Sequence, residues 1–243
     1  MALNDGDVIK FDYTLIVDGN AVETSSEEAA KEHGFHEEGR QYNPLTVTIG
    51  ARQIIQGLEK VLVAKAKEGA EFEAEIKAID AYGERQMSLV KDVPMALFKK
   101  QKVVPRPGMV VNHENQRAVV TRVAGGRVRL DMNHDLAGKD LTYKVSVVKV
   151  VDDEEGKLQA TLENLFPMGG YHVENTETAV RLEIPDQAKF DQQWPMHKFR
   201  VVSALRAVTG MDKDIQLIET FPAMPNVPAE HVHDEDCAHG EEE

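Results

Sequence analysis

Alternating apolar and polar side chains run through most of the first 83 residues, stop there, and resume only at Leu141. A period of two is typical of half-buried antiparallel strands, whose successive side chains point to opposite faces. It predicts strands at residues 8–17, 21–24, 45–50 and 71–79, and a long final strand at 141–151. Because the last strand completes the pattern of the earlier ones, we interpret residues 84–130 as a module inserted into one sheet.

One segment before residue 83 has helical spacing instead. Between Gln53 and Ala66, apolar residues recur every three or four positions, which places them on one face: Ile54, Leu58, Val61, Leu62 and Ala66. As this is the only helix predicted in residues 1–83, we expect it to pack on the sheet. Asp18-Gly19 lies between two alternating runs and predicts a tight hairpin turn.

The remaining chain divides at two changes of pattern. Residues 84–130 contain Val93-Pro94, Pro105 to Gly108 and Gly125-Gly126, which predict a small β-rich module. Residues 153–222 predict a separate α/β domain with helices and strands in alternation. Its second helix should begin near Pro195 and end at Gly210, with an apolar face formed by Phe199, Val202 and Leu205.

Charge and composition exclude several classes of function. The net charge is −14, and half of it lies in residues 223–243, which hold seven acidic residues and no Lys or Arg. An acidic chain argues against nucleic acid and anionic membrane as main partners. With one cysteine, no leader and no long apolar run, we expect a cytoplasmic protein without an intrachain disulfide. Phosphate-binding, metalloprotease and esterase motifs do not occur.

Several short motifs, in order along the chain, carry a family resemblance. They are Tyr13, Asp18-Gly19, Pro44-Leu45, the Ile-Ile-Gln-Gly-Leu-Glu of residues 54–59, the Ala-Tyr-Gly of 81–83 and the Asn-His-Asp-Leu-Ala-Gly of 133–138. Over residues 3–152 the chain resembles SlyD-like FKBP-type peptidyl-prolyl cis/trans isomerases, and its additional C-terminal domain resembles that of the long archaeal members. The resemblance implies an α+β protein with the FKBP fold, a twisted antiparallel sheet wrapped on one helix.

The same resemblance implies a division into parts. Residues 1–83 and 131–152 would form a discontinuous catalytic domain, and 84–130 the chaperone domain inserted in its flap. Residues 153–222 would form a C-terminal α/β domain associated with homodimerisation, followed by an acidic, His-containing tail at 223–243. The implied partners are unfolded or partly folded proline-containing proteins, and no cofactor is required.

Site residues follow from the matching positions. The resemblance assigns catalysis to Tyr13, Glu23, Ile55 and Tyr82, and substrate binding to Val22, Leu45, Ile54, Leu58, Leu136 and Tyr143. The Tyr82 hydroxyl and the Ile55 N–H are the expected hydrogen-bond donors to substrate. Two positions depart from the family: Leu58 stands where many members have Trp, and Glu23 replaces an Asp that pairs with Tyr13. The alternative is that Ile54, Leu58 and Tyr82 are only core residues.

The insert holds more apolar residues than so small a module readily buries. We interpret a subset as a chaperone surface for unfolded chains: Met87, Leu89, Val93, Met95, Leu97, Phe98, Val103 and Met109. The alternative is that all of them form the core of the module.

Donor atoms in the tail offer a second chemistry. His231, His233, Cys237 and His239 suit weak binding of Ni, Zn or Cu by ligand type, although a solvated acidic tail explains the same residues. Two further hypotheses therefore remain beside the isomerase: a non-catalytic holdase, and a chaperone that binds metal through its tail.

Overall fold

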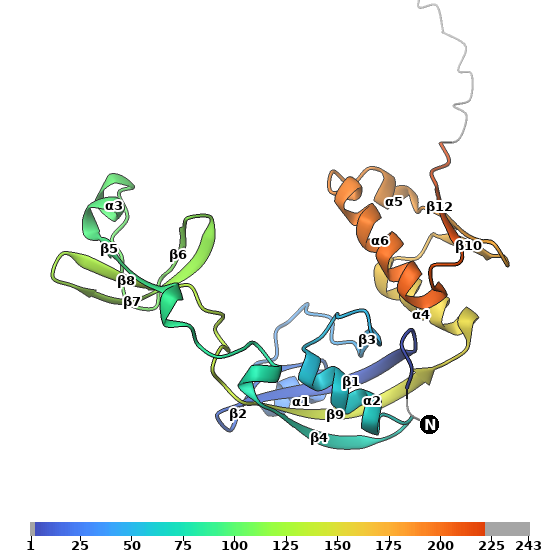
Figure 1. Cartoon of the computed structure of the whole chain (residues 1–243), viewed down its shortest axis with the longest axis horizontal. Helices are drawn as coiled ribbons and strands as arrows, with labels where there is room; N and C mark the ends of the chain where they lie inside the picture. Colours follow the sequence, from blue (N-terminus) through green and yellow to red (C-terminus); the bar gives the residue numbers. More distant parts are fainter. Residues whose placement is uncertain (1–2, 222–243) are drawn as a thin grey trace, which may run out of the picture.

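The computed structural model describes residues 3–221, and these residues form three sheets with separate cores (Figure 1). The first sheet has the order β2-β1-β9-β4, with β3 paired to β1. Its strands are β1 (Val8–Val17), β2 (Asn20–Thr24), β3 (Leu45–Thr48), β4 (Glu71–Ile76) and β9 (Leu141–Val151). All these pairs are antiparallel. The α+β fold class predicted from the sequence is confirmed.

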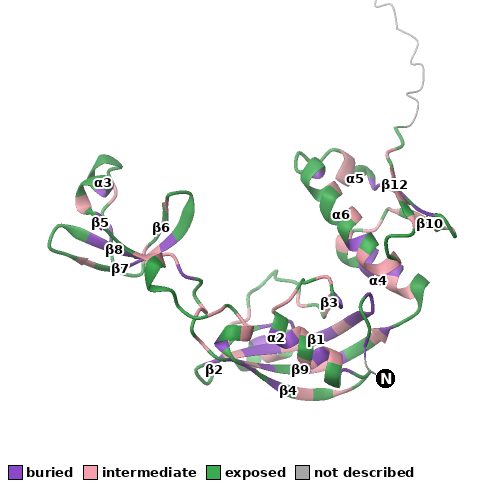
Figure 2. Cartoon of the chain, in the orientation of Figure 1, coloured by how far each residue is buried: buried purple, intermediate pink, exposed green. Residues whose placement is uncertain are grey.

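Helix α2 (Gln56–Lys65) packs on one face of this sheet. Its Leu58 and Leu62 join the core formed by β1 and β9, which is visible as buried strand segments in Figure 2. The helix begins three residues later than predicted, so Ile54 and Ile55 lie in the loop before it. A short helix that the sequence analysis missed, α1 (Glu27–Glu32), follows β2 and is capped by Ser26.

The hairpin between β1 and β2 has the predicted geometry. Asp18 has φ 51° and Gly19 has φ 81°, and two positive φ values are characteristic of the tight turns that match strand twist. Strand β4 ends earlier than predicted, because the chain turns into a 3₁₀ helix, η1 (Ala78–Asp80), directly before Tyr82.

Between η1 and β9 the chain leaves the first sheet and forms a four-stranded sheet of order β5-β8-β7-β6. Its elements are η2 (Met87–Leu89), β5 (Val90–Pro94), α3 (Met95–Lys100), β6 (Val110–His113), β7 (Gln116–Ala124) and β8 (Arg127–Asp131). Val93 and Phe98 are each only 6% exposed and pack with Val120, Val128 and Leu130. Their assignment to a chaperone surface was wrong, because β5 and α3 direct them into the core.

The C-terminal residues form the third sheet, of order β10-β11-β12, together with three helices. The elements are α4 (Glu154–Leu165), β10 (His172–Asn175), β11 (Ala179–Glu183), α5 (Asp186–Lys189), α6 (Trp194–Thr209) and β12 (Asp214–Ile218). Helix α6 buries Trp194, Val201 and Leu205, whereas Phe199 is 78% exposed. The predicted apolar face of α6 was therefore wrong at Phe199.

The C-terminal part is joined to the first sheet by contacts in addition to the chain itself. Lys157 of α4 forms an ion pair with Asp7 at 2.7 Å, and both side chains are largely buried. Nearby, Val8 and Val151 pack against Ala160. In Figure 1 the insert and the C-terminal part lie at opposite ends of the first sheet.

Candidate active site

A hollow of about 420 Å³ opens between the N-terminus of α2 and the concave side of the first sheet. The residues that line it are Tyr13, Glu23, Leu45, Arg52, Gln53, Ile54, Ile55, Leu58, Tyr82 and Tyr143. Eight of the ten residues predicted for the cleft are therefore brought together. They come from five strands and helices, β1, β2, β3, α2 and β9, and from the two loops before α2 and after η1.

Two predicted residues do not line the hollow. Val22 is 50% exposed; it precedes Glu23 on β2, and neighbouring residues of a strand point to opposite faces. Leu136 packs against the core of the first sheet. Arg52 and Gln53, which were not predicted as cleft residues, also line the hollow, and both lie in the loop before α2. Gln53 fixes this loop, because its Oε1 accepts a hydrogen bond from the N–H of Thr48 at 2.9 Å.

Aromatic side chains form one wall. The rings of Tyr13 and Tyr143 lie 5.9 Å apart, and the Tyr13 hydroxyl donates to Glu23 Oε1 at 2.9 Å. The longer acid at position 23 therefore still forms the expected pair. Burial raises the pKa of both phenols, and the Glu23 carboxylate raises it further. Both tyrosines stay neutral at physiological pH, so the wall remains an uncharged surface.

Two of the residues that line the hollow carry a hydrogen-bond donor without a partner in the described chain. Ile55 is the N-cap residue of α2 with extended backbone angles, and its N–H has no acceptor among residues 3–221. Unsatisfied N–H groups and the helix dipole make a helix N-terminus attractive to a carbonyl oxygen. The hydroxyl of Tyr82 likewise has no partner within the described chain, and the residue is 39% exposed.

The ring of Tyr82 is held by an interaction that the sequence did not reveal. His134 stacks on it with ring centroids 3.9 Å apart and planes 4° from parallel. The neighbouring Asp135 forms an ion pair with Arg117 of the insert at 3.0 Å. Position 82 is therefore connected to the insert through one short segment, residues 134–135.

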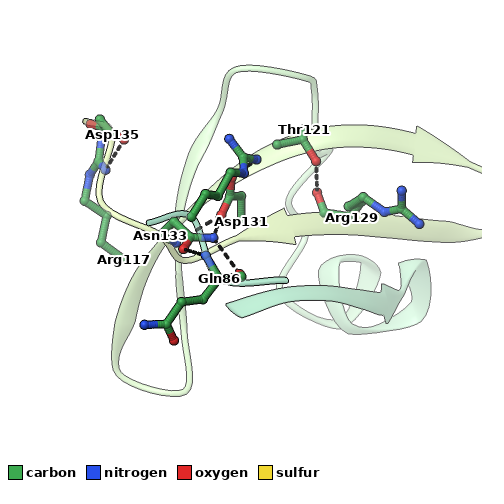
Figure 3. Close-up of polar contacts among 8 residues, drawn as sticks. Gln86, Arg117, Thr121, Arg129, Asp131, Asn133 and Asp135 are labelled. Atoms are coloured by element: carbon green, nitrogen blue, oxygen red, sulfur yellow. Dashed lines mark hydrogen bonds and ion pairs between the residues drawn. The ribbon is translucent and has the colours of Figure 1, made fainter. Parts of the chain in front are cut away.

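The two chain crossings between the first sheet and the insert are bonded to each other (Figure 3). The N–H of Gln86 donates to Asn133 Oδ1 at 2.8 Å, and Asn133 Nδ2 donates back to the carbonyl of Gln86 at 3.0 Å. Asp131 accepts from Asn133 and forms an ion pair with Arg85. Such a reciprocal pair restrains the orientation of the insert relative to the hollow.

The metal site predicted in the tail is not tested by the structure. His231, His233, Cys237 and His239 lie outside the described residues, so metal binding by the tail stays a prediction. Within residues 3–221 there is no group of three or more side chains suited to hold a metal ion. No helix in this part of the chain is both long and apolar enough to cross a membrane.

Comparisons with known proteins agree with this geometry. A family model for FKBP-type peptidyl-prolyl cis-trans isomerase matches residues 1–99. Models described as FKBP26, IF domain, and as the FKBP26 C-terminal region match residues 91–136 and 154–222. These matches confirm the resemblance that the motifs indicate.

Individual relatives cover different shares of the chain. A short-type peptidyl-prolyl cis-trans isomerase of Methanocaldococcus jannaschii is 33% identical over 145 residues, which are 60% of this chain and 92% of that protein. SlyD of Helicobacter pylori is 34% identical over 46% of this chain and 63% of its own length. SlyD of Vibrio cholerae is 36% identical over 44% of this chain and 54% of its own length. The chain thus spans less than two thirds of these SlyD proteins.

Proposed function

Since the chain belongs to the FKBP-type peptidyl-prolyl cis-trans isomerase family, we propose that the hollow between α2 and the first sheet binds X-Pro segments and eases rotation about their amide bond. Membership of this family makes the chain an isomerase, and we further propose which of its residues act and by what physical mechanism. The observation that carries it is the convergence of three tyrosines, two isoleucines and two leucines on one concavity.

The mechanism needs no covalent step. Resonance holds the amide planar with a barrier of about 18–20 kcal/mol. Twisting the bond removes the resonance and reduces its charge separation, so water stabilises the planar state more than the twisted one. Aliphatic and aromatic walls such as Leu58 and Tyr143 exclude that water. Each ~1.4 kcal/mol of preference for the twisted state corresponds to about a tenfold faster rate.

Hydrogen bonds orient the substrate inside this apolar surface. We assign the N–H of Ile55 to one substrate carbonyl and the hydroxyl of Tyr82 to another. Both groups are free within the described chain, and both belong to residues that line the hollow. Tyr13, in contrast, donates to Glu23, which leaves its ring as a wall.

Replacing Tyr82 tests this assignment. Tyr82→Phe keeps the ring on His134 and removes only the donor, so we expect kcat/KM on a proline tetrapeptide to fall about fivefold, the equivalent of one net hydrogen bond of ~1 kcal/mol. Tyr82→Ala also opens the rim and should cost more than tenfold. NMR exchange spectroscopy measures both rates.

Tyr171→Phe is the matched control, because its hydroxyl accepts from Gln159 in the C-terminal part and its loss should leave turnover unchanged. Wild-type rates in both Tyr82 variants would contradict the assignment. Absence of turnover in the wild-type chain would favour the non-catalytic holdase instead.

We also propose that the insert captures unfolded clients. Of the predicted surface, Met87 and Leu97 are exposed, and Val104 and Val110 expose further apolar area. Leu89, Met95, Val103 and Met109 are partly buried. Strands β5 and β6 are the edges of the four-stranded sheet, and edge strands can pair with an extended segment.

A homodimer through residues 153–222 is a further proposal, supported by apolar side chains exposed on this part. Met168, Phe190, Met196 and Phe199 are each at least 77% exposed, which is unusual for a surface that stays in water. Analytical ultracentrifugation should give twice the chain mass for the wild type and the monomer mass for Met196→Asp/Phe199→Asp. Met211→Asp, beyond the end of α6, should remain dimeric. A monomeric wild type would refute the dimer.

A further inference from the structure

The insert has the opposite charge to the rest of the chain. Residues 84–130 contain ten Lys or Arg and three acidic residues, so they carry +7. Because the whole chain carries −14, the remaining residues carry −21. A difference of this size within one chain produces a strong local positive potential over a module of 47 residues.

Ion pairs do not neutralise this charge. Asp92 pairs with Arg129, Glu114 with Lys91, and Asp131, at the end of β8, with Arg85. Six cationic residues of the insert have no carboxylate partner within residues 3–221: Lys99, Lys100, Lys102, Arg106, Arg122 and Arg127. The positive charge of these six residues is therefore available to bind a ligand.

Three arginines lie together on the outer face of the insert's sheet. On β8, Val128 and Leu130 point into the core, so Arg127 and Arg129 point outward. Arg122 of β7 is the register partner of Arg129. The three line a hollow of about 290 Å³ with Asp92, Ala124 and Gly125. We call these three residues, Arg122, Arg127 and Arg129, the arginine face.

The field at the arginine face already acts on one carboxylate. The pKa of Asp92 is lowered, first by its hydrogen bonds from Arg129 and further by the charges of Arg127 and Arg122. Arg129 donates two hydrogen bonds to the Asp92 carboxylate, at 3.0 and 2.8 Å. The guanidinium groups of Arg122 and Arg127 remain for other carboxylates, which they can hold in bidentate fashion.

We propose that the arginine face binds acidic side chains of unfolded polypeptides, so that the insert selects client segments in which Asp or Glu accompany apolar residues. The inference rests on the proposed client capture and adds the class of client to it. The apolar residues Val104 and Val110 of the same module would contact the apolar part of such a segment.

A short acidic peptide fits this surface better than a nucleic acid. A duplex carries one charge per ~1.7 Å and extends beyond so small a module. Its phosphates would approach the −21 of the remaining chain within a few Debye lengths of ~10 Å each. A peptide with a few carboxylates stays within the field of the insert.

Fluorescence anisotropy with paired peptides tests the proposal on the full chain. Two labelled peptides of about 15 residues share one apolar, proline-containing sequence and differ only by four Glu or four Gln. At about 50 mM salt we expect the Glu peptide to bind about tenfold more tightly, and at about 500 mM salt the difference should largely disappear because the charges are screened.

Charge reversal locates the site. Arg122→Glu/Arg127→Glu should abolish the preference for the Glu peptide, while Lys99→Glu/Lys100→Glu, which changes the net charge equally on α3, should keep most of it. All four residues are exposed, so both variants should have the melting temperature of the wild type. Equal binding of the two peptides would overturn the proposal, as would tighter binding of a single-stranded oligonucleotide of matched charge. Failure of both peptides to bind would instead refute client capture itself.

Discussion

Replacing residues 87–131 by a short Gly-Ser linker is expected to leave tetrapeptide turnover within about threefold of the wild type and to slow catalysis of proline-limited refolding about 100-fold. The hollow contains no residue of this segment. A client held by the insert has its prolines at an effective concentration of order millimolar near the cleft. Losing the capture site removes that advantage for proteins and not for short peptides.

The structure suggests where to cut. Gln86 and Asn133 are bonded to each other at 2.8 and 3.0 Å, so the two ends already lie together. Removing Asp131 with the insert leaves Arg85 without its carboxylate partner. Arg85 itself is about half exposed and can remain as a surface residue.

A matched control keeps the insert and impairs only the cleft. Tyr82→Ala should lower tetrapeptide turnover and catalysis of refolding by the same factor. The deletion should lower catalysis of refolding much more than tetrapeptide turnover. Equal losses in both assays for the deletion variant would mean that the insert supports the cleft directly, for example through Arg117 and Asp135, and would contradict capture by the insert.

The local sequence pattern was sufficient to predict those elements whose structure depends on residues close together in the sequence. Alternation located β1 and β9 and the interruption between them, and Asp18-Gly19 gave the hairpin. The position of each cleft residue came from the family resemblance rather than from periodicity. Periodicity alone could not separate a cleft residue such as Ile54 from a core residue such as Leu62.

The errors arose where packing chooses between two apolar faces. On α6, Phe199 and Met196 compete with Val201 and Leu205 for the buried side, and only contact with α4 and the third sheet decides. In the insert the total of apolar residues suggested a surface, but Val93 and Phe98 fill the core. The stacking of His134 on Tyr82 depends on two segments separated by the whole insert, and no local signal encodes it.

Gly57→Ala is expected to lower the free energy of unfolding by about 3 kcal/mol, the upper range for an overpacked core. A Cβ at this position would lie 2.3 Å from Ile76 Cγ2 and 3.0 Å from the carbonyl oxygen of Asp80. Gly57 is in α2, where Ala is otherwise favoured by about 1 kcal/mol. A destabilisation must therefore come from the close approach of the helix to β4 and η1.

The same contact should couple Gly57 to catalysis. Asp80 ends η1 two residues before Tyr82, so a methyl group that displaces Asp80 also displaces the hydroxyl at the rim, and turnover should fall more than tenfold at temperatures where the variant remains folded. Ala64→Gly, at an exposed position of the same helix, should cost only about 1 kcal/mol and leave turnover unchanged. Chemical denaturation and tetrapeptide exchange measure the two effects. A Gly57→Ala variant as stable and active as the wild type would show that α2 can move away from η1, and the rigid placement of Tyr82 above the cleft would then be wrong.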